Sequence, residues 1–572
     1  MPIETIRHEG PGRLGILKLE GREERFETPT VDLSLSPFNS LFNPSPPGNY
    51  DLNLAPSIPL GFYSPEEIVR KAVDRIRSVS YDGYNTFYLP ALKKAKMLDE
   101  FVGIIEDNHS EAVYVGNSRQ LTKNYREFVE ILRRLRERFP NVLIVIDLEP
   151  YFYPLAVYLG VDAFDTRSLR LYDFENKAFT QYSPLVWGEG SNSVEFSRSM
   201  IEIVRRAIKD GKLRQIVENF LHTPSHEGIL RIADVEYGDY LEEYTPTTPR
   251  TIYFISNDSL RRPEVRRWQR RVLQRFEPPE NTRLVLLFPC SAKKPYSTSR
   301  SHMLYRKTVR EAVGDGIHLI HDLVLTSPLG VVPREWERLA KYDIVVTGHW
   351  SREEVESSSE LLAKTLEKYP KDVPIVAHLD GPYVEIAREA AERSGREIIF
   401  TSVKDSTTSR NSLGSLRDTL LEFKENLNAS KRDRKYREKE WIRKIFDYYL
   451  GKGAGAAVLP NEARIRGSRM LIISVDGRQT GTLRDAAISL TPFGMQRVYE
   501  TTKSYWVEVD FELRGDVFAV GVNAADERIR PDDVVGIIRD GEVIGVGRAV
   551  LSGREMLKTK RGIAVKVKNK KR

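Results

Sequence analysis

Cysteine is nearly absent from this chain, because Cys290 is the single thiol in 572 residues. One cysteine excludes an internal disulfide framework and any zinc or iron–sulfur site of the Cys-x-x-Cys kind. A site of histidines and carboxylates stays open, but the nine histidines are scattered along the sequence. We therefore expect no bound metal, and any thiol chemistry must use Cys290.

Long apolar runs are missing as well. No run approaches the ~20 residues that span a bilayer, and residues 1–5 lack a signal-peptide pattern. We expect a cytoplasmic protein with no membrane partner. A hydrophobic content of 40% and a charged content of 30% are ordinary for a globular chain. The length predicts roughly three to four domains.

A nucleotide-binding loop is also absent. Gly451-Lys452-Gly453 has the composition of a phosphate loop but not the spacing of one. We therefore expect no nucleotide site and no resident cofactor.

Charge is concentrated locally, although the net charge is only +7. The carboxyl terminus, residues 566–572, is basic, and arginines crowd one predicted helix. Such clusters bind phosphate backbones or form a solvated face. The helix carries Arg261, Arg262, Arg266, Arg267, Arg270, Arg271 and Arg275.

The only cysteine lies in a distinctive stretch, residues 289–302 (PCSAKKPYSTSRSH). An apolar run of buried-strand type, residues 284–288, precedes it, and apolar residues recur at helical spacing after it. Cys290 is thus expected in a loop at the carboxyl end of a strand, where α/β sheets bind ligands. A thiol reacts as its thiolate, which the cations of this loop would favour. The alternative, a small buried apolar cysteine, fits the polar neighbours less well.

The spacing of Pro289-Cys290, Lys294-Pro295-Tyr296, Ser299 and His302 resembles the signature of the archaeosine synthase family. That family is a paralogue of the archaeal tRNA-guanine transglycosylases. The motif is long and specific, and the resemblance extends over nearly the whole chain.

Residues 1–245 read as repeated strand–helix units, such as the strand at 142–147 and the helix at 125–139. Residues 159–166 and 204–218 resemble segments of the transglycosylases, which implies their (β/α)8 barrel, a TIM-barrel-like fold. The aspartate loop and the three zinc-binding cysteines of those enzymes have no match here. Base exchange is therefore doubtful, and Asp147, Glu149 and Asp165 are expected to be structural.

Residues 246–428 predict a doubly wound α/β domain around the Cys290 motif. Apolar runs follow at 319–325, 344–346, 374–377 and 398–400, with helices predicted at 333–340 and 383–392. If the strands are parallel, the loops after them meet at one rim. Those loops bring His349, His378 and Asp380 to Cys290 as candidate substrate-binding residues, although turn chemistry alone explains each loop.

Two smaller domains complete the chain. Residues 429–503 predict an α+β unit that begins with a charge-dense segment, residues 426–439. Residues 504–572 resemble the PUA domain, a small β-barrel that binds RNA, and folded RNA is recognised largely by shape and backbone contacts. The resemblance makes the basic clusters candidates for RNA binding. The expected RNA-binding residues are Gly515, Gly521, Arg530, Gly547, Arg548, Lys568 and Lys570.

The family resemblance also implies a reaction. Its substrate is 7-cyano-7-deazaguanine (preQ0) at position 15, in the D arm of tRNA, and its nitrile carbon is an electrophile. Cys290 would add to this carbon, and an amine would then displace the thiol to leave an amidine. Lys294 or His302 would maintain the thiolate and shuttle protons. Tyr296 and Ser299 would hydrogen-bond the base or the developing anion.

Several alternatives stay open. The amine donor is either free lysine, with a radical-SAM partner subunit releasing archaeosine afterwards, or ammonia from an amide donor. A true tRNA-guanine transglycosylase and a tRNA-binding scaffold without its own chemistry are the rival functions. An oligomer of identical or different subunits is expected in each case.

Overall fold

The computed structural model describes residues 3–18, 25–90, 94–180, 183, 185–187, 192–248, 250–344 and 348–571. The chain divides into two compact units, which are treated separately below. The first holds Met1–Thr247, Val507–Asp533 and Arg548–Val567, and the second holds Thr248–Trp506, Val534–Gly547 and Lys568–Arg572. Among these described ranges, no helix is both long and apolar enough to cross a membrane.

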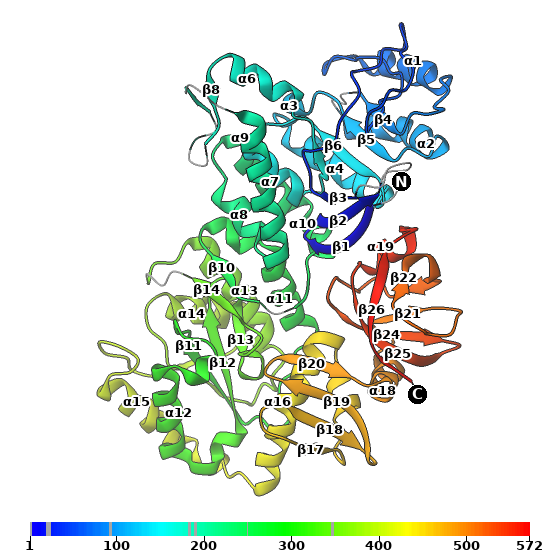
Figure 1. Cartoon of the computed structure of the whole chain (residues 1–572). Helices are drawn as coiled ribbons and strands as arrows, with labels where there is room; N and C mark the ends of the chain where they lie inside the picture. The colour runs from blue at the N-terminus through cyan, green and yellow to red at the C-terminus, as the bar shows by residue number, and fades with distance from the viewer. Residues whose placement is uncertain are drawn as a thin grey trace. The chain divides into compact units, whose positions relative to one another are not determined.

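The first unit begins with an antiparallel sheet and continues into a parallel one (Figure 1). β1 (Ile3–Glu9), β2 (Gly12–Lys18) and β3 (Arg25–Thr28) form the antiparallel sheet. β4 (Thr86–Leu89), β5 (Ala112–Val115), β6 (Leu143–Ile146) and β7 (Ala163–Phe164) are parallel and pair in chain order. The helices are α1 (Glu66–Arg77), α2 (Asp99–Asp107), α3 (Ser118–Leu121), α4 (Tyr125–Arg138), α5 (Tyr153–Tyr158), α6 (Arg170–Phe174), α7 (Ser193–Asp210), α8 (Leu213–Asn219), α9 (Pro224–Glu236) and α10 (Gly238–Glu243), and a short hairpin is formed by β8 (Lys177–Ala178) and β9 (Val186–Trp187).

The eight-stranded barrel implied by the resemblance is not confirmed. The described residues give four regular parallel strands, and less regular segments link the two edges of their sheet. Single parallel bridges join Thr30 to Ala163, Leu35 to Leu52, and Leu54 to Thr86. The predicted strand at 142–147 and the predicted helix at 125–139 are present within one or two residues.

Alternation along the strands separates two cores in this unit. Ala112, Tyr114 and Val145 pack with Leu33 and Leu54 in an inner cluster. The intervening residues, such as Val113 and Ile144, face a larger cluster that includes the helices. The four-stranded sheet and its linking segments therefore surround an apolar interior.

The second unit is organised around a five-stranded sheet in the order β13-β12-β11-β15-β16. Its strands are β11 (Leu284–Pro289), β12 (Ile320–Thr326), β13 (Gly330–Pro333), β15 (Ile375–Ala377) and β16 (Ile399–Phe400). All neighbours are parallel except the β12–β13 hairpin. The predicted doubly wound pattern is thus present, and Figure 1 shows α12 (Arg300–Val313) and α15 (Arg410–Glu422) on one side of the sheet, with α13 (Arg352–Leu366) and α14 (Pro382–Ser394) on the other.

Two predictions for this sheet are wrong in detail. β14 (Tyr342–Ile344) does not join it but pairs with β10 (Ile252–Phe254), so the third predicted run belongs to a separate two-stranded sheet. The remaining residues of that run, 345 and 346, lie outside the described residues. The helix expected at 333–340 is only one short turn, Arg334–Trp336.

The rest of the second unit consists of helices and an antiparallel sheet. α11 (Pro263–Gln274) precedes β11, and a 20-residue helix, α16 (Lys431–Leu450), follows α15. A capping box at Ser430 and Asp433 starts α16. The segment continues with α17 (Ala454–Val458), β17 (Arg464–Arg466), β18 (Leu471–Val475), β19 (Arg478–Arg484), β20 (Ala487–Leu490) and α18 (Pro492–Thr502).

The carboxyl-terminal segment is built of short strands, as predicted. They are β21 (Trp506–Glu508), β22 (Val517–Phe518), β23 (Ala524–Ala525), β24 (Val534–Arg539), β25 (Glu542–Ala549) and β26 (Ile563–Lys570), with one helix, α19 (Gly553–Lys558). Within the first unit, β21 pairs with β23 and β22 pairs with β26, both antiparallel.

Candidate functional site

The strand order places Cys290 at the switch point of the sheet. β11 is flanked by β12 on one side and by β15 on the other, and both run parallel to it. The chain therefore leaves the carboxyl ends of β11 and β15 in opposite directions, and open α/β sheets bind ligands at such a switch point. Cys290 follows the last residue of β11 and is half-buried, so its sulfur is not sealed in the core.

A tyrosine of the helix that follows β15 contacts the thiol. Tyr383, in the first turn of α14 after β15, has its hydroxyl 3.0 Å from the Cys290 sulfur. Burial and the negative charge of Cys290 raise the pKa of Tyr383 well above its ordinary value. The phenol therefore keeps its proton, and it can donate a hydrogen bond to a thiolate. Trp350 packs edge-on against Tyr383 at 5.0 Å between ring centroids.

Lys294, four positions after Cys290, is a cation of the same loop. Its Nζ is buried without a hydrogen-bond partner among the described residues, and it lies 4.1 Å from the centroid of the Tyr342 ring. Burial lowers the pKa of Lys294, against the opposing charges of Cys290 and Asp343. The amine is thereby brought nearer to a neutral state, in which it could accept a proton.

His302 lies beneath the loop and has no free ring nitrogen. Its Nε2 is 3.0 Å from the carbonyl oxygen of Pro289, and its Nδ1 is 3.1 Å from the Arg334 guanidinium. A carbonyl only accepts and a guanidinium only donates, so His302 is neutral and carries its proton on Nε2. Burial and the charge of Arg334 lower the pKa of His302 to about 3. The prediction that it shuttles protons is corrected to positioning, because it holds the carbonyl that precedes Cys290.

Tyr296 and Ser299 are both buried. Tyr296 is fully buried, with its hydroxyl 2.6 Å from that of Tyr342, which in turn bonds Thr326. Ser299 caps α12 by accepting a hydrogen bond from the amide of His302. Both residues shape the Cys290 loop, and the prediction that they bind substrate directly is corrected accordingly.

The three residues predicted on neighbouring loops have different positions. His378 is buried: its Nε2 donates to the Thr407 carbonyl and its Nδ1 accepts from the Thr401 hydroxyl. Burial lowers its pKa, so it is a structural histidine. His349 is exposed on the loop before Trp350. Asp380 is half-buried, and its backbone oxygen accepts the amide of Tyr383, which starts α14. Of the three, Asp380 is the one with a backbone hydrogen bond to Tyr383, whose hydroxyl contacts the Cys290 sulfur.

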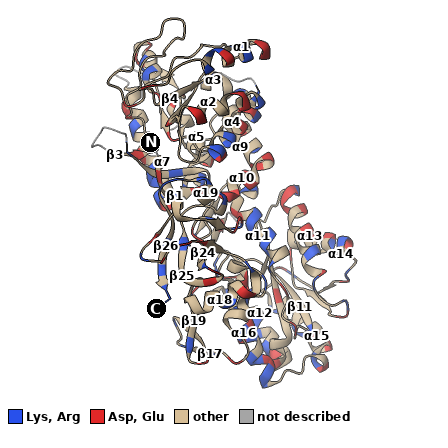
Figure 2. Ribbon diagram, turned by 90° about the vertical axis from the view of Figure 1, so that its right-hand side faces the viewer, with Lys and Arg blue, Asp and Glu red and all other residues tan. Residues whose placement is uncertain are grey.

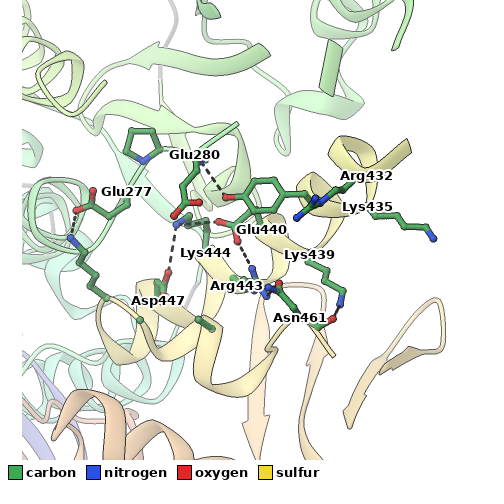
Figure 3. Close-up of a pocket in the computed structure, with 15 residues that line it drawn as sticks. Glu277, Glu280, Arg432, Lys435, Lys439, Glu440, Arg443, Lys444, Asp447 and Asn461 are labelled. Atoms are coloured by element: carbon green, nitrogen blue, oxygen red, sulfur yellow. Dashed lines mark hydrogen bonds and ion pairs between the residues drawn. The ribbon is translucent and has the colours of Figure 1, made fainter. Parts of the chain in front are cut away.

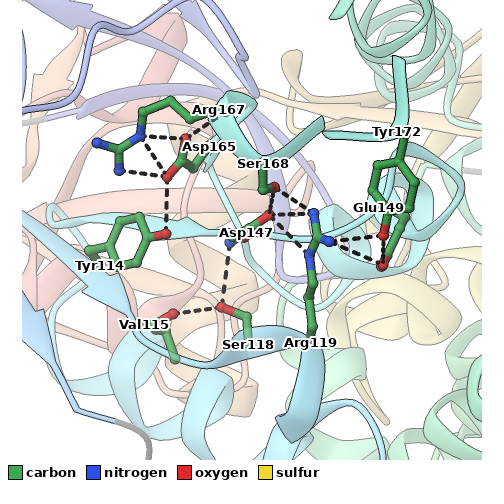
Figure 4. Close-up of polar contacts among 10 residues, drawn as sticks. All are labelled: Tyr114, Val115, Ser118, Arg119, Asp147, Glu149, Asp165, Arg167, Ser168 and Tyr172. Carbon is green, nitrogen blue, oxygen red and sulfur yellow. Dashed lines mark hydrogen bonds and ion pairs between the residues drawn. The ribbon is translucent and has the colours of Figure 1, made fainter. Parts of the chain in front are cut away.

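A second polar cluster follows the parallel strands of the first unit (Figure 4). Asp147 accepts from Arg119 and Ser168, and Asp165 accepts from Arg167. The remaining members extend the network, with Tyr114 bonded to Asp165 and Tyr172 to Glu149. A cavity of about 330 Å³ adjoins the cluster. Each carboxylate already has a hydrogen-bonded partner, which agrees with the structural role expected from the sequence.

The predicted RNA-binding residues divide into exposed and engaged groups. Lys568 and Lys570 are exposed on alternate positions of β26, and Gly515 is exposed, so these three are accessible. Gly521 packs closely, since a Cβ there would lie 2.6 Å from the Phe511 ring. Gly547 is buried, Arg548 donates to the Asp532 carbonyl, and Arg530 pairs with Glu242 at 2.8 Å.

The arginine-rich helix α11 is not the surface cluster that its sequence suggested. Arg262, Arg267 and Arg271 are buried. Arg271 lies over the Tyr448 ring, and Arg275 donates to the carbonyl oxygens of Tyr448 and Tyr449. Guanidinium groups that stack on rings and cap carbonyls stabilise the fold, so this helix offers few free cations to RNA.

Comparisons with known proteins match two parts of the chain to family models and the whole chain to a relative. A family model described as "Domain of unknown function (DUF5591)" matches residues 265–420, which contain the Cys290 loop, and a "PUA domain" model matches residues 507–571. The chain is 63% identical to "Archaeosine synthase subunit alpha" of Thermococcus kodakarensis, over 99% of this chain and all of that protein.

More distant relatives fall into two groups. "Archaeosine synthase" of Methanocaldococcus jannaschii is 30% identical, over 87% of this chain and 85% of that protein. "tRNA-guanine(15) transglycosylase" of Methanothermobacter thermautotrophicus is 24% identical, over 73% of this chain and 64% of that protein. The full-length match lies with the first group, while the second shares part of its length.

Proposed function

The chain belongs to the archaeosine synthase family, and from this premise we propose that it is a tRNA-modifying enzyme of archaeosine synthesis. Its substrate is the nitrile of 7-cyano-7-deazaguanine in the D arm of tRNA. Its product is an amidine, formed with free lysine or with ammonia from an amide donor. The observation that carries this proposal is the half-buried Cys290 sulfur at the switch point, 3.0 Å from the Tyr383 hydroxyl.

The first step is addition of the thiol to the nitrile. The Cys290 sulfur bonds to the nitrile carbon, one carbon–nitrogen π pair moves to nitrogen, and the thiol proton ends on that nitrogen. The product is a neutral thioimidate. The lowered pKa of Lys294 supports its role as the base that takes the thiol proton and returns it to nitrogen.

The second step releases the enzyme. The amine donor adds to the thioimidate carbon, the carbon–sulfur bond breaks, and one amine proton returns to the sulfur. Atoms and electrons balance without an oxidant, a reductant or an activated phosphate. Tyr383 supports both steps, because its hydroxyl can hydrogen-bond the sulfur when it is negatively charged, before addition and after release.

The pairing of the aspartates in the first unit supports this reaction over glycosidic exchange. A transglycosylase needs a free carboxylate nucleophile, whereas Asp165 is held by Arg167 and Tyr114, and Asp147 by Arg119 and Ser168. The first unit and the carboxyl-terminal domain are proposed to hold the tRNA. The relative from Thermococcus kodakarensis is named as a subunit alpha, which supports a partner subunit that completes the modification.

The test uses nitrile-bearing tRNA with the full-length protein and, in parallel, lysine, glutamine or ammonium. Mass spectrometry of the digested tRNA reports the mass gained by the modified base, which identifies the donor directly. Unmodified tRNA with free base is the matched control for transglycosylation. Incorporation of the base there, with no gain on nitrile-bearing tRNA, would establish the rival reaction instead.

A further inference from the structure

One face of α16 lines a hollow of about 900 Å³ in the second unit (Figure 3). The lining residues recur every three or four positions from Arg432 to Asp447, so they share a single helix face. At a rise of 1.5 Å per residue this face is about 22 Å long. Glu277, Glu280 and Asn461 are among the residues that line the hollow with it.

The inner end of this hollow is electrostatically balanced. Glu440 pairs with Arg443 at 2.9 Å and with Lys444 at 3.3 Å. Lys452 pairs with Glu277 at 2.9 Å. Burial raises the pKa of Asp447 to about 6, and its carboxylate accepts the amide of Gly455. These groups satisfy one another and leave little charge for a ligand.

The outer end carries cations without acidic partners. Arg432 and Lys435 are exposed, and no acid of the described residues lies within ion-pair distance of either. Lys439 donates to the Ala463 carbonyl, which fixes the start of β17 beside α16. The exposed side chains of β17, Arg464 and Arg466, also have no ion-pair partner in the part of the chain that is described. We call these five residues the α16 cation strip.

Several other cations of this unit are paired with acids. Arg261 pairs with Glu353, Lys341 with Asp485, and Lys364 with Glu360, at 2.6–3.0 Å. Figure 2 shows how the charged residues of both signs are distributed over the ribbon. The α16 cation strip is therefore a local excess of positive charge. Its side chains carry no large apolar group, such as the aromatic anchors that protein interfaces use.

We propose that the α16 cation strip binds the phosphate backbone of the tRNA on which Cys290 acts. The inference rests on the proposed function for the identity of the RNA. Unpaired cations in a row match a chain of phosphates, and their binding releases condensed counterions. Such contacts carry no base information, so they fit a surface that holds the tRNA body rather than the modified base.

The test replaces three strip residues at once, as Arg432→Gln, Lys435→Gln and Arg466→Gln. Binding of nitrile-bearing and nitrile-free tRNA to the full chain is measured between low and moderate salt. The slope of log affinity against log salt should fall by about 2 to 3, since each phosphate contact contributes ~0.7–0.9. Both tRNAs should lose affinity equally.

The matched control removes the same charge elsewhere in the unit. Lys364→Gln, Lys371→Gln and Arg388→Gln replace exposed cations outside the strip, and they should leave the slope within 1 of the wild type. A reverse variant, Glu280→Gln with Glu462→Gln, removes exposed acids beside the strip and should tighten binding at low salt. A disturbance of the fold by these substitutions would weaken tRNA binding and would not tighten it.

The outcomes separate this proposal from the proposed function. If the strip and control variants have the same salt slope, the α16 cation strip does not bind tRNA, whether or not the protein forms the adduct. Loss of adduct formation at saturating tRNA also overturns it, because a backbone contact should change KM and not the rate at saturation. Retained tRNA binding with loss of a partner protein would assign the strip to that protein instead. A wild type that binds tRNA with the expected slope but forms no adduct refutes only the chemistry.

Discussion

Replacing Tyr383 with phenylalanine tests the hydrogen bond that the structure places on the nucleophile. The change removes one oxygen, which lies 3.0 Å from the Cys290 sulfur. A hydrogen bond to a charged group contributes ~1.5–3 kcal/mol. At a factor of ten per 1.36 kcal/mol, the rate of addition should fall by about 10- to 150-fold.

The assay is single-turnover formation of the protein–tRNA adduct at saturating nitrile-bearing tRNA, without an amine donor. Saturation removes differences in RNA affinity, so the rate reports the chemical step. Tyr305→Phe is the matched control, because its buried hydroxyl bonds Thr407 at 2.6 Å. It should cost ~1 kcal/mol of stability and leave the rate unchanged. Equal rates for the Tyr383 and Tyr305 variants would refute the assigned role of Tyr383.

Three further predictions follow from other contacts. Lys294→Arg should slow adduct formation at least about tenfold in the same assay. Burial lowers the pKa of Lys294, which lets it accept a proton, whereas a guanidinium keeps its proton and cannot act as a base. An unchanged rate would exclude Lys294 as the base. In the wild type, the free energy of unfolding measured with urea should fall between pH 6.5 and pH 3, because the unfolded histidine takes up a proton that the folded one, with its pKa of about 3, does not. His302→Gln should reduce the dependence of this free energy on pH by up to about 1.4 kcal/mol per pH unit. An equal pH dependence in the two proteins would contradict the neutral state of His302. Asp162→Asn should lower the free energy of unfolding by about 3–5 kcal/mol, because it leaves Arg13 and Arg136 buried without their shared carboxylate. The measurement is the Tm, and an unchanged Tm would contradict the buried ion pairs of Asp162.

Periodicity was sufficient to place the main elements around the nucleophile. The apolar run that ends at Pro289 is β11, and the helix predicted at 383–392 is α14. Parallel strands then bring the segments after β11 and β15 together, which is why their approach at Cys290 could be expected. These features depend on local pattern and on one topological rule, both of which a sequence carries.

The partners of the thiol could not be predicted in the same way. Tyr383 is 93 positions from Cys290, and Arg334 is 32 positions from His302. No local motif marks Tyr383 or Arg334 as part of the site. Motif spacing also does not report the direction of a side chain, so Tyr296 and His302 were expected to face the substrate although both are buried.

The parallel sheet of the first unit includes irregular segments that sequence patterns do not predict. Residues 30–36 and 52–55 contribute backbone hydrogen bonds to its edges, for example from Ala55 to the Thr86 carbonyl. They lack the alternation of a regular strand, and prolines lie close by at Pro37 and Pro56. A pattern search overlooks such segments, because their pairing depends on neighbours that are distant in sequence.

The central claim is that the Cys290 sulfur forms a covalent bond with the nitrile carbon. Nitrile-bearing tRNA should be incubated with the protein in the absence of any amine and of any reductant, quenched, and digested under mildly acidic conditions for peptide mapping by mass spectrometry. The account predicts one modified peptide, with the base attached to Cys290, and none for Cys290→Ser. An amidine product formed by the Cys290→Ala variant at the wild-type rate, once the donor is supplied, would contradict it.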